Sequence, residues 1–98
     1  MADWIYKIVG EQEWRDAEGI GLYDGSADDR RDGFIHLSTA AQLEGTVRRY
    51  FAGRGDLFCV TVDPDGLDVR WEPSRGGQLF PHLYGPLPMR SVRAVERI

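Results

Sequence analysis

The hydrophobic residues of this chain lie mainly in short runs that are rich in β-branched and aromatic side chains. Runs of this length and composition predict β-strands, and polar or glycine-containing stretches separate them. The almost wholly apolar run at 57–62 is typical of a central strand that is covered on both faces. The predicted strands are residues 4–9, 34–38, 57–62, 69–72 and 91–98, with an extended segment at 80–84.

Two other segments have the spacing of an amphipathic helix. In residues 11–18, Trp14 and Ala17 fall on one helical face. A second helix is expected to begin at Thr39, because Gln42 follows three residues later and the pair matches a capping box. The apolar stripe that this second helix is expected to bury consists of Leu43, Val47, Tyr50 and Phe51.

By contrast, residues 24–33 contain one alanine among polar and turn-forming residues, which predicts a mobile surface loop. Five or so strands and two helices indicate an α+β protein. A chain of 98 residues is long enough for one hydrophobic core, so residues 1–98 are expected to form a single domain.

Charge and composition exclude several classes of function. The formal net charge is −4, which argues against a general nucleic-acid-binding protein because phosphate binding requires a positive surface. No long apolar run occurs and no basic, apolar leader follows Met1, so we expect a cytoplasmic protein without a membrane partner. Cys59 is the single cysteine, so it cannot form an internal disulfide, and we expect it to be inert core.

The two histidines of the chain, His36 and His82, lie in similar sequence contexts. Each has a phenylalanine two positions before it and a hydroxyl side chain two positions after it, Ser38 and Tyr84 respectively. On a strand this spacing puts the imidazole and the hydroxyl on one face, where both can bind the same ligand. The alternative is that each histidine is a half-buried strand residue bonded to a neighbouring carbonyl. The pair forms no recognisable metal-ligand spacing, so no metal is expected.

Arg70 and Glu72 are predicted to share one face of the strand at 69–72. They form either an exposed ion pair or a binding pair. In the second interpretation, Arg70 holds a phosphate, and Glu72 contacts a sugar hydroxyl or stabilises positive charge on the sugar. Tyr84 lies in a proline-bounded loop and is a candidate platform on which a base or ring would stack.

Several stretches of the chain together resemble the small bacterial family called domain of unknown function 952. They are residues 5–8, the segment around Trp14, residues 33–38 with Gln42 after them, and residues 80–86. The resemblance covers nearly the whole chain, and it implies an α+β fold similar to that of the ADP-ribosyltransferases. That fold has two packed sheets and a cleft that holds NAD or ADP-ribose in the relatives.

Within that superfamily, the chain is similar to the RNA 2'-phosphotransferases. The resemblance implies that His36 contacts a nucleotide and that Lys7 occupies a first-strand position that is usually Arg or His. The late glutamate of the active relatives has no firm counterpart, because Glu72 precedes the His82 motif and Glu96 lies two residues from the chain end.

We therefore predict a protein that binds a small-molecule nucleotide, with NAD as a candidate substrate, as a monomer or homodimer. In this hypothesis Lys7 and Arg70 hold the pyrophosphate, and transfer of an ADP-ribosyl or phosphate group could follow. Two alternatives stay open: a non-catalytic nucleotide-binding module and a two-histidine cyclic phosphodiesterase. The candidate catalytic residues are His36, His82 and Glu72, and the candidate substrate-binding residues are Lys7, Ser38, Arg70 and Tyr84.

Overall fold

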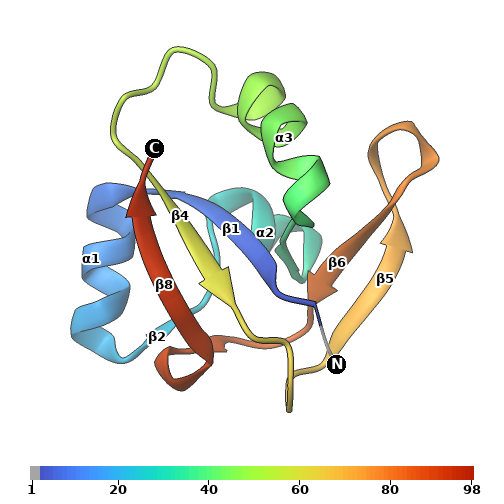
Figure 1. Cartoon of the computed structure of the whole chain (residues 1–98). Coiled ribbons are helices and arrows are strands. Elements are labelled where there is room, and N and C mark those ends of the chain that lie inside the picture. Colours follow the sequence, from blue (N-terminus) through green and yellow to red (C-terminus); the bar gives the residue numbers. More distant parts are fainter. Residues whose placement is uncertain (1–2) are drawn as a thin grey trace.

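The computed structural model describes residues 3–98, apart from the side chain of Arg75. Within these residues, eight strands form three small sheets, which are accompanied by three α-helices (Figure 1). The predicted α+β class is confirmed, whereas the strand and helix counts exceed the prediction. None of the described helices is long and apolar enough to cross a membrane. Short 3-10 turns lie at Ala40–Gln42, Arg75–Gly77 and Met89–Ser91.

The first sheet is antiparallel and has the order β1-β4-β8. These strands are β1 (Ile5–Gly10), β4 (Leu57–Val62) and β8 (Val92–Arg97). β4 is the central strand, as its apolar sequence predicts. Helix α1 (Glu11–Ile20) packs on this sheet through Trp14, which has no exposed surface. The first predicted helix is therefore confirmed and extends two residues further than expected.

The second three-stranded sheet has the order β3-β6-β5 and carries both histidines. Its strands are β3 (Ile35–His36), β6 (Leu79–Leu83) and β5 (Val69–Pro73). His36 pairs with His82 across β3 and β6, so the two sequence motifs lie side by side. β6 is the central strand, which places His82 in the middle of this sheet.

Further pairing joins these sheets to the rest of the molecule. A two-stranded sheet pairs β2 (Leu22–Tyr23) with β7 (Leu87–Pro88). Beyond β3, the Ser38 N–H donates to the Tyr6 carbonyl at 2.8 Å, and the Tyr6 N–H donates to the Ser38 carbonyl at 2.9 Å. This bridge links β1 of the first sheet to the segment that leaves the second sheet.

The segment at 24–33, predicted to be a mobile loop, contains helix α2 (Ala27–Asp32). The Ser26 hydroxyl accepts a hydrogen bond from the Asp29 N–H, and the Asp29 carboxylate accepts one from the Ser26 N–H. Gly33 ends the helix at a φ of 88°, a left-handed conformation that favours glycine. The loop prediction is wrong. It rests on the lack of an apolar stripe in residues 24–33, but capping hydrogen bonds at the ends of this short helix stabilise it without such a stripe.

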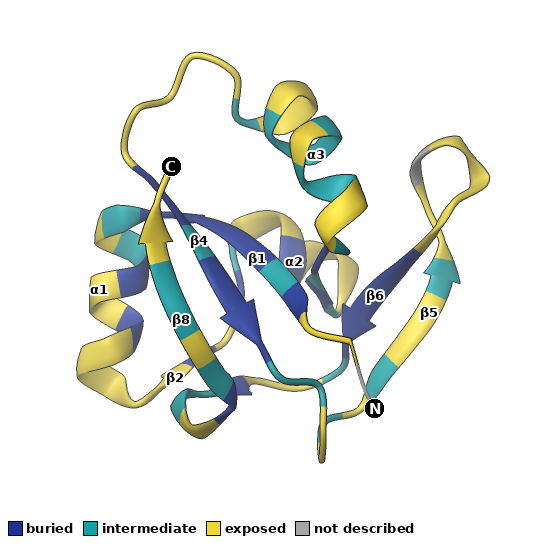
Figure 2. Cartoon of the chain, viewed as in Figure 1, coloured by how far each residue is buried: buried dark blue, intermediate teal, exposed yellow. Residues whose placement is uncertain are grey.

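Helix α3 (Leu43–Tyr50) follows the capping box of Thr39 and Gln42, which is confirmed. The buried stripe predicted for this helix is wrong. None of its residues is fully buried, and Tyr50 is 58% exposed (Figure 2). Thr46 and Tyr50 of this helix instead line a hollow beside the sheets.

Cys59 is half-buried in β4 instead of being sealed in the core. It lies opposite Glu96 on the neighbouring strand β8, which does not cover it fully. Burial raises the pKa of the Cys59 thiol, and the negative charge of Glu96 raises it further. The thiol therefore stays protonated near neutral pH, as expected for an unreactive cysteine.

Candidate functional site

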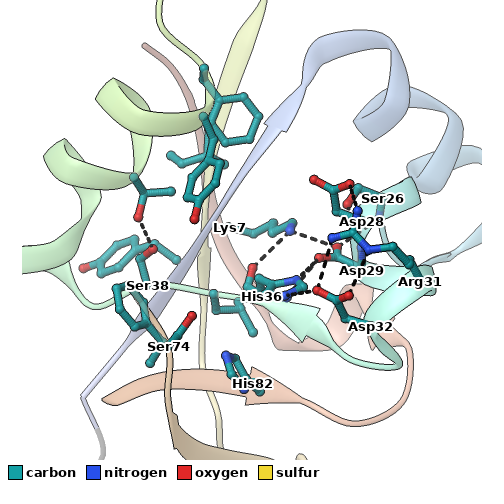
Figure 3. A pocket seen from close by; sticks show the side chains of 17 residues that line it. Lys7, Ser26, Asp28, Asp29, Arg31, Asp32, His36, Ser38, Ser74 and His82 are labelled. Carbon is teal, nitrogen blue, oxygen red and sulfur yellow. Dashed lines mark hydrogen bonds and ion pairs between the residues drawn. The ribbon is translucent and has the colours of Figure 1, made fainter. Parts of the chain in front are cut away.

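A hollow of about 250 Å³ lies beside β1, β3, α2 and α3 (Figure 3). It combines aromatic and aliphatic surface with hydrogen-bonding groups, a composition typical of small-molecule sites. The apolar wall includes Tyr6, Ile8, Leu37, Phe51 and Phe80. The polar wall includes Lys7, Asp29, Asp32, His36, Ser38 and His82.

The histidines of the two sequence motifs meet at this hollow. Their ring centroids are 5.5 Å apart, and the ring planes are inclined by 70°. Phe34, two positions before His36, stacks on the His82 ring with 4.1 Å between centroids. Ser38 lines the same hollow. The structure thus brings together His36, His82, Ser38 and Lys7, four of the seven residues selected from the sequence.

Asp29 is the buried centre of the polar wall, with 2% of its surface exposed. Its Oδ1 lies 2.6 Å from His36 Nδ1 and accepts from the His36 backbone N–H at 3.1 Å. Its Oδ2 lies 2.9 Å from Lys7 Nζ. Burial alone would raise the pKa of the Asp29 carboxyl, but the hydrogen bond from His36 and the charge of Lys7 lower it below its ordinary value. Asp29 is therefore a buried anion that ties α2 to β1 and β3.

Lys7 reaches the hollow from β1, but its ammonium group is already paired. The side chain is 8% exposed, and besides Asp29 it contacts the backbone carbonyl of His36, to which Nζ donates at 3.0 Å. A buried charge needs such partners because it has lost its water. A phosphate in the hollow would have to compete with Asp29 for Lys7.

His36 is held at both ring nitrogens. Nδ1 lies 2.6 Å from Asp29 Oδ1, and Nε2 lies 3.0 Å from Asp32 Oδ2. The Nδ1 contact has the geometry of a hydrogen bond, and Nε2 faces the second carboxylate at ion-pair distance. Neither nitrogen is left for a ligand in this arrangement. Within residues 3–98, no group of three or more His, Cys, Asp or Glu side chains is placed to hold a metal ion.

His82 has a different environment, in which one ring nitrogen is paired and the other is not. Nδ1 lies 2.8 Å from Glu72 Oε1, and the Tyr84 hydroxyl donates to the same oxygen at 2.8 Å. The hydrogen bond from His82 and then that from Tyr84 lower the pKa of Glu72, so its carboxylate is ionised near neutral pH. Nε2 of His82 is buried and has no hydrogen-bond partner among the described residues.

Arg70, Glu72 and Tyr84 do not line the hollow. The Arg70 guanidinium lies 4.2 Å from the centroid of the Tyr84 ring and donates to Asp68. One face of the Tyr84 ring is therefore covered. Lys7 lines the hollow and Arg70 does not, and the two side chains are bound to different carboxylates, so the structure does not bring together the two residues expected to hold a pyrophosphate.

The sequence analysis missed Asp29 and Asp32, which lie in the segment taken for a loop. A signal for them is present in the sequence. Ser26, three positions before Asp29, is a typical start of a short helix. Gly33, directly after Asp32, is a typical stop. These two capping residues predict one ordered helix that carries both carboxylates, although the composition of the segment is polar.

The comparisons with known proteins agree with this fold. The family described as "Protein of unknown function (DUF952)" matches residues 8–95. The chain belongs to the DUF952 family. The resemblance to that family is therefore confirmed, while the resemblance to the ADP-ribosyltransferases stays a prediction.

This DUF952 protein is similar to the protein CC0527 from Caulobacter crescentus. The X-ray structure of CC0527 has 43% sequence identity and a TM-score of 0.91, and the match covers 96% of this chain and 84% of that chain. The X-ray structure of a double mutant of CC0527 gives the same values. The solution NMR structure, also at 43% identity, has a TM-score of 0.86 and covers 97% and 84% of the two chains. No curated protein matches this DUF952 chain.

Proposed function

We propose that this protein binds a nucleotide of the NAD or ADP-ribose type, with a ribose and its attached ring in the hollow. The observation that carries the proposal is the meeting of His36, His82 and Ser38 at one partly apolar hollow, together with the lack of a hydrogen-bond partner among the described residues for the buried Nε2 of His82. A buried polar atom without a partner is uncommon in folded proteins, and a ligand hydroxyl is one group that satisfies it.

The size of the hollow limits how much of such a ligand it encloses. Pockets for drug-sized ligands usually measure about 300 to 1,000 Å³. The hollow measures about 250 Å³, so a whole dinucleotide exceeds it and a sugar with one ring is the part we place inside. Aromatic side chains in its wall, Tyr6, Phe51 and Phe80, offer surface for that ring.

The charges in the wall favour a sugar over a diphosphate inside the hollow. Lys7 is paired with Asp29, and Arg31 is paired with Asp28 and Asp32. Both cations at the hollow are therefore already neutralised by neighbouring carboxylates. Uncharged hydroxyl groups do not need an unpaired cation, whereas a diphosphate gains most from one.

Ser38 supplies a hydroxyl at the wall next to the sugar. Its Oγ lies 2.9 Å from Thr46 Oγ1 of α3, and either atom can be the donor. A pair of hydroxyls can both donate to and accept from a polyol such as ribose. Within this proposal, Ser38 contacts a ribose hydroxyl.

The proposal is limited to binding because of where Glu72 lies. Its carboxylate contacts His82 and Tyr84 and does not line the hollow, so it is not placed to stabilise a ribose cation. This observation favours the non-catalytic module over a transferase. The two-histidine phosphodiesterase is less favoured, because both nitrogens of His36 face carboxylates.

Titration with ADP-ribose and with NAD, followed by protein NMR, tests the proposal. We expect shifts concentrated at residues of β1, β3 and α3, with Ser38→Ala weakening the affinity about threefold to tenfold, the value of one net hydrogen bond. Ser91→Ala is the matched control, because Ser91 is as buried as Ser38, at 5% against 4%, but does not line the hollow. No shift at the hollow with either nucleotide at about 1 mM would contradict the proposal.

Nicotinamide release from NAD is the measurement that separates binding from turnover. A non-catalytic module leaves NAD intact during long incubation. Release of nicotinamide above the rate without protein would show that the C1'–N bond breaks and would restore the transferase alternative. Release that falls in Ser38→Ala but not in Ser91→Ala would assign the activity to the hollow, whereas equal release in both variants would indicate contaminating activity.

A further inference from the structure

The two histidines at the hollow differ in one respect that their similar sequence contexts do not predict. Both nitrogens of His36 face carboxylates, whereas His82 has one paired nitrogen and one that is free. His82 Nε2 is the buried side-chain nitrogen or oxygen that lacks a hydrogen-bond partner in the described part of the chain. The ring belongs to the wall of the hollow, and 3% of the residue is exposed.

Glu72 determines which nitrogen of the neutral His82 ring carries the proton. The Glu72 carboxylate is ionised and only accepts hydrogen bonds, and the Tyr84 hydroxyl already donates to the same Oε1. The 2.8 Å contact between Oε1 and His82 Nδ1 is therefore a hydrogen bond only if Nδ1 is the donor. When the ring is neutral, a proton on Nδ1 leaves a lone pair on Nε2.

We propose that Glu72 is a positioning residue that holds neutral His82 protonated at Nδ1, so that Nε2 accepts a hydrogen bond from a hydroxyl of the ligand in the hollow. The nature of that ligand rests on the proposed function. Phe34 fixes the plane of the His82 ring by stacking on it, with 4.1 Å between the ring centroids. The hydrogen bond to Glu72 fixes the orientation of the ring within that plane.

The groups around the His82 ring leave Nε2 available as a hydrogen-bond acceptor, because none of them forms a second hydrogen bond to the ring. Glu72 and Arg70 approach from β5, Tyr84 follows on from β6, and His36 lies edge-on from β3. Arg70 is bound to Asp68 and lies over Tyr84, so it does not supply a donor to His82 in this arrangement. None of these described side chains donates to Nε2, and a ligand hydroxyl is a donor of the kind that it lacks.

Nitrogen NMR of the histidine side chains tests the proton position directly. Protonated and unprotonated ring nitrogens have well separated 15N shifts, and the chain has two histidines to assign. At a pH where the ring is neutral, we expect His82 to carry its proton on Nδ1 alone. A proton on Nε2 in the wild-type protein would overturn the proposal, whether or not any variant folds.

Two variants separate positioning from packing. Glu72→Ala removes the acceptor, so we expect His82 to become a mixture of both tautomers. Tyr84→Phe is the matched control, because it removes the other donor to Glu72 but leaves the His82 contact, and it is expected to keep the proton on Nδ1. An unchanged tautomer in folded Glu72→Ala would overturn the role of Glu72.

Addition of ADP-ribose tests the acceptor role and separates it from the proposed function. Acceptance of a ligand hydroxyl shifts the Nε2 resonance of the wild-type protein, and we expect Glu72→Ala to bind about threefold to tenfold more weakly. Glu96→Ala, on the exposed β8 strand, is expected to bind normally. Binding that leaves Nε2 unmoved would overturn the acceptor role while the proposed function survives. Absence of binding would end the proposed function, and the wild-type tautomer would then decide whether Glu72 positions His82.

Discussion

At the scale of single residues, Asp29 connects the most elements at the hollow. It belongs to α2, pairs with Lys7 of β1 and bonds both the ring and the backbone of His36 in β3. The ion pair with Lys7 has 8% and 1% of its two side chains exposed. A buried pair of this kind does not guarantee high stability, but loss of one partner leaves a buried charge without compensation.

Asp29→Asn is therefore expected to lower the free energy of unfolding by about 3 to 5 kcal/mol, the usual cost of breaking a buried ion pair. Asp28→Asn is the control on the neighbouring position of the same helix, where the side chain is 70% exposed. It is expected to change stability by less than about 0.5 kcal/mol. Urea unfolding of the two variants makes the comparison, and equal losses would contradict the central role of Asp29.

The same carboxylate predicts how stability depends on pH. The pKa of Asp29 is lowered on folding, so its contribution is fully present above the unfolded value of about 3.8 and is lost as pH falls toward the folded pKa. The difference in unfolding free energy between wild type and Asp29→Asn should be constant near neutral pH and shrink below about pH 4. Urea unfolding of both proteins between neutral and acid pH measures it. A difference that grows on acidification would have the wrong sign.

The sequence could identify His36 and His82 as candidates and could place Asp29 on a short capped helix, but it could not show that Asp29 is buried, for a physical reason. A histidine two positions from an aromatic and a hydroxyl is visible as a local pattern on a strand. Burial of Asp29 depends on Lys7, which lies 22 positions earlier and reaches it only after the chain has folded. The missing hydrogen bond of His82 Nε2 is likewise a property of the packed sheet.

At the scale of elements, α2 shows how a six-residue helix can form without an apolar stripe. Its start is the Ser26 and Asp29 capping box, and its end is Gly33. Gly25, just before the cap, has a φ of 108°, and a Cβ there would lie 2.8 Å from the Asp29 Cβ. Glycine at this position lets the chain pass close to the buried carboxylate.

Ser26→Ala is expected to destabilise the protein by about 1 kcal/mol, because the first turn of α2 loses the acceptor for the Asp29 N–H. The loss should be local at first. Amide hydrogen exchange in α2 should accelerate by about fivefold, which corresponds to about 1 kcal/mol, while exchange in β4 changes less. Ser74→Ala, at an exposed serine, is the control. Equal acceleration in α2 and β4 would contradict a local role of the cap.

The elements that the sequence predicts correctly have a strong local pattern. β1, β4, β8 and α1 each carry five or more residues of regular spacing, and the cap at Thr39 is a two-residue motif. The strands β2 and β7 have two residues each. Two residues are too few to show the alternation of apolar and polar positions by which a strand is recognised. α3 shows the opposite failure, because its stripe is real in the sequence but is not buried, and Tyr50 and Phe51 at its end line the hollow.

At the scale of the whole molecule, one core supports both three-stranded sheets. Its buried cluster includes Ile5 and Val60 of the first sheet, Ile35 and Leu83 of the second, and Trp14 of α1. The Tyr6 to Ser38 bridge and the hydrogen bond from Lys7 Nζ to the His36 carbonyl join the same two sheets on the side of the hollow. The hollow therefore lies where the two three-stranded sheets meet, and both sheets pack against the same hydrophobic core.

This shared core predicts that Trp14→Ala destabilises the second sheet although Trp14 packs on the first. Trp14 has no exposed surface, and loss of such a side chain usually costs about 3 to 5 kcal/mol. Trp71→Ala is the matched control, because Trp71 belongs to the second sheet but is 48% exposed, and it is expected to cost less than about 1 kcal/mol.

Urea unfolding followed by circular dichroism gives the size of each loss, and hydrogen exchange gives its location. Trp14→Ala should accelerate exchange at amides of β4 and of β6 together, because neither sheet keeps a core without the other. Protection retained in β6 after protection is lost in β4 would show that the two sheets unfold separately, and the junction at the hollow would then be a contact between independent units.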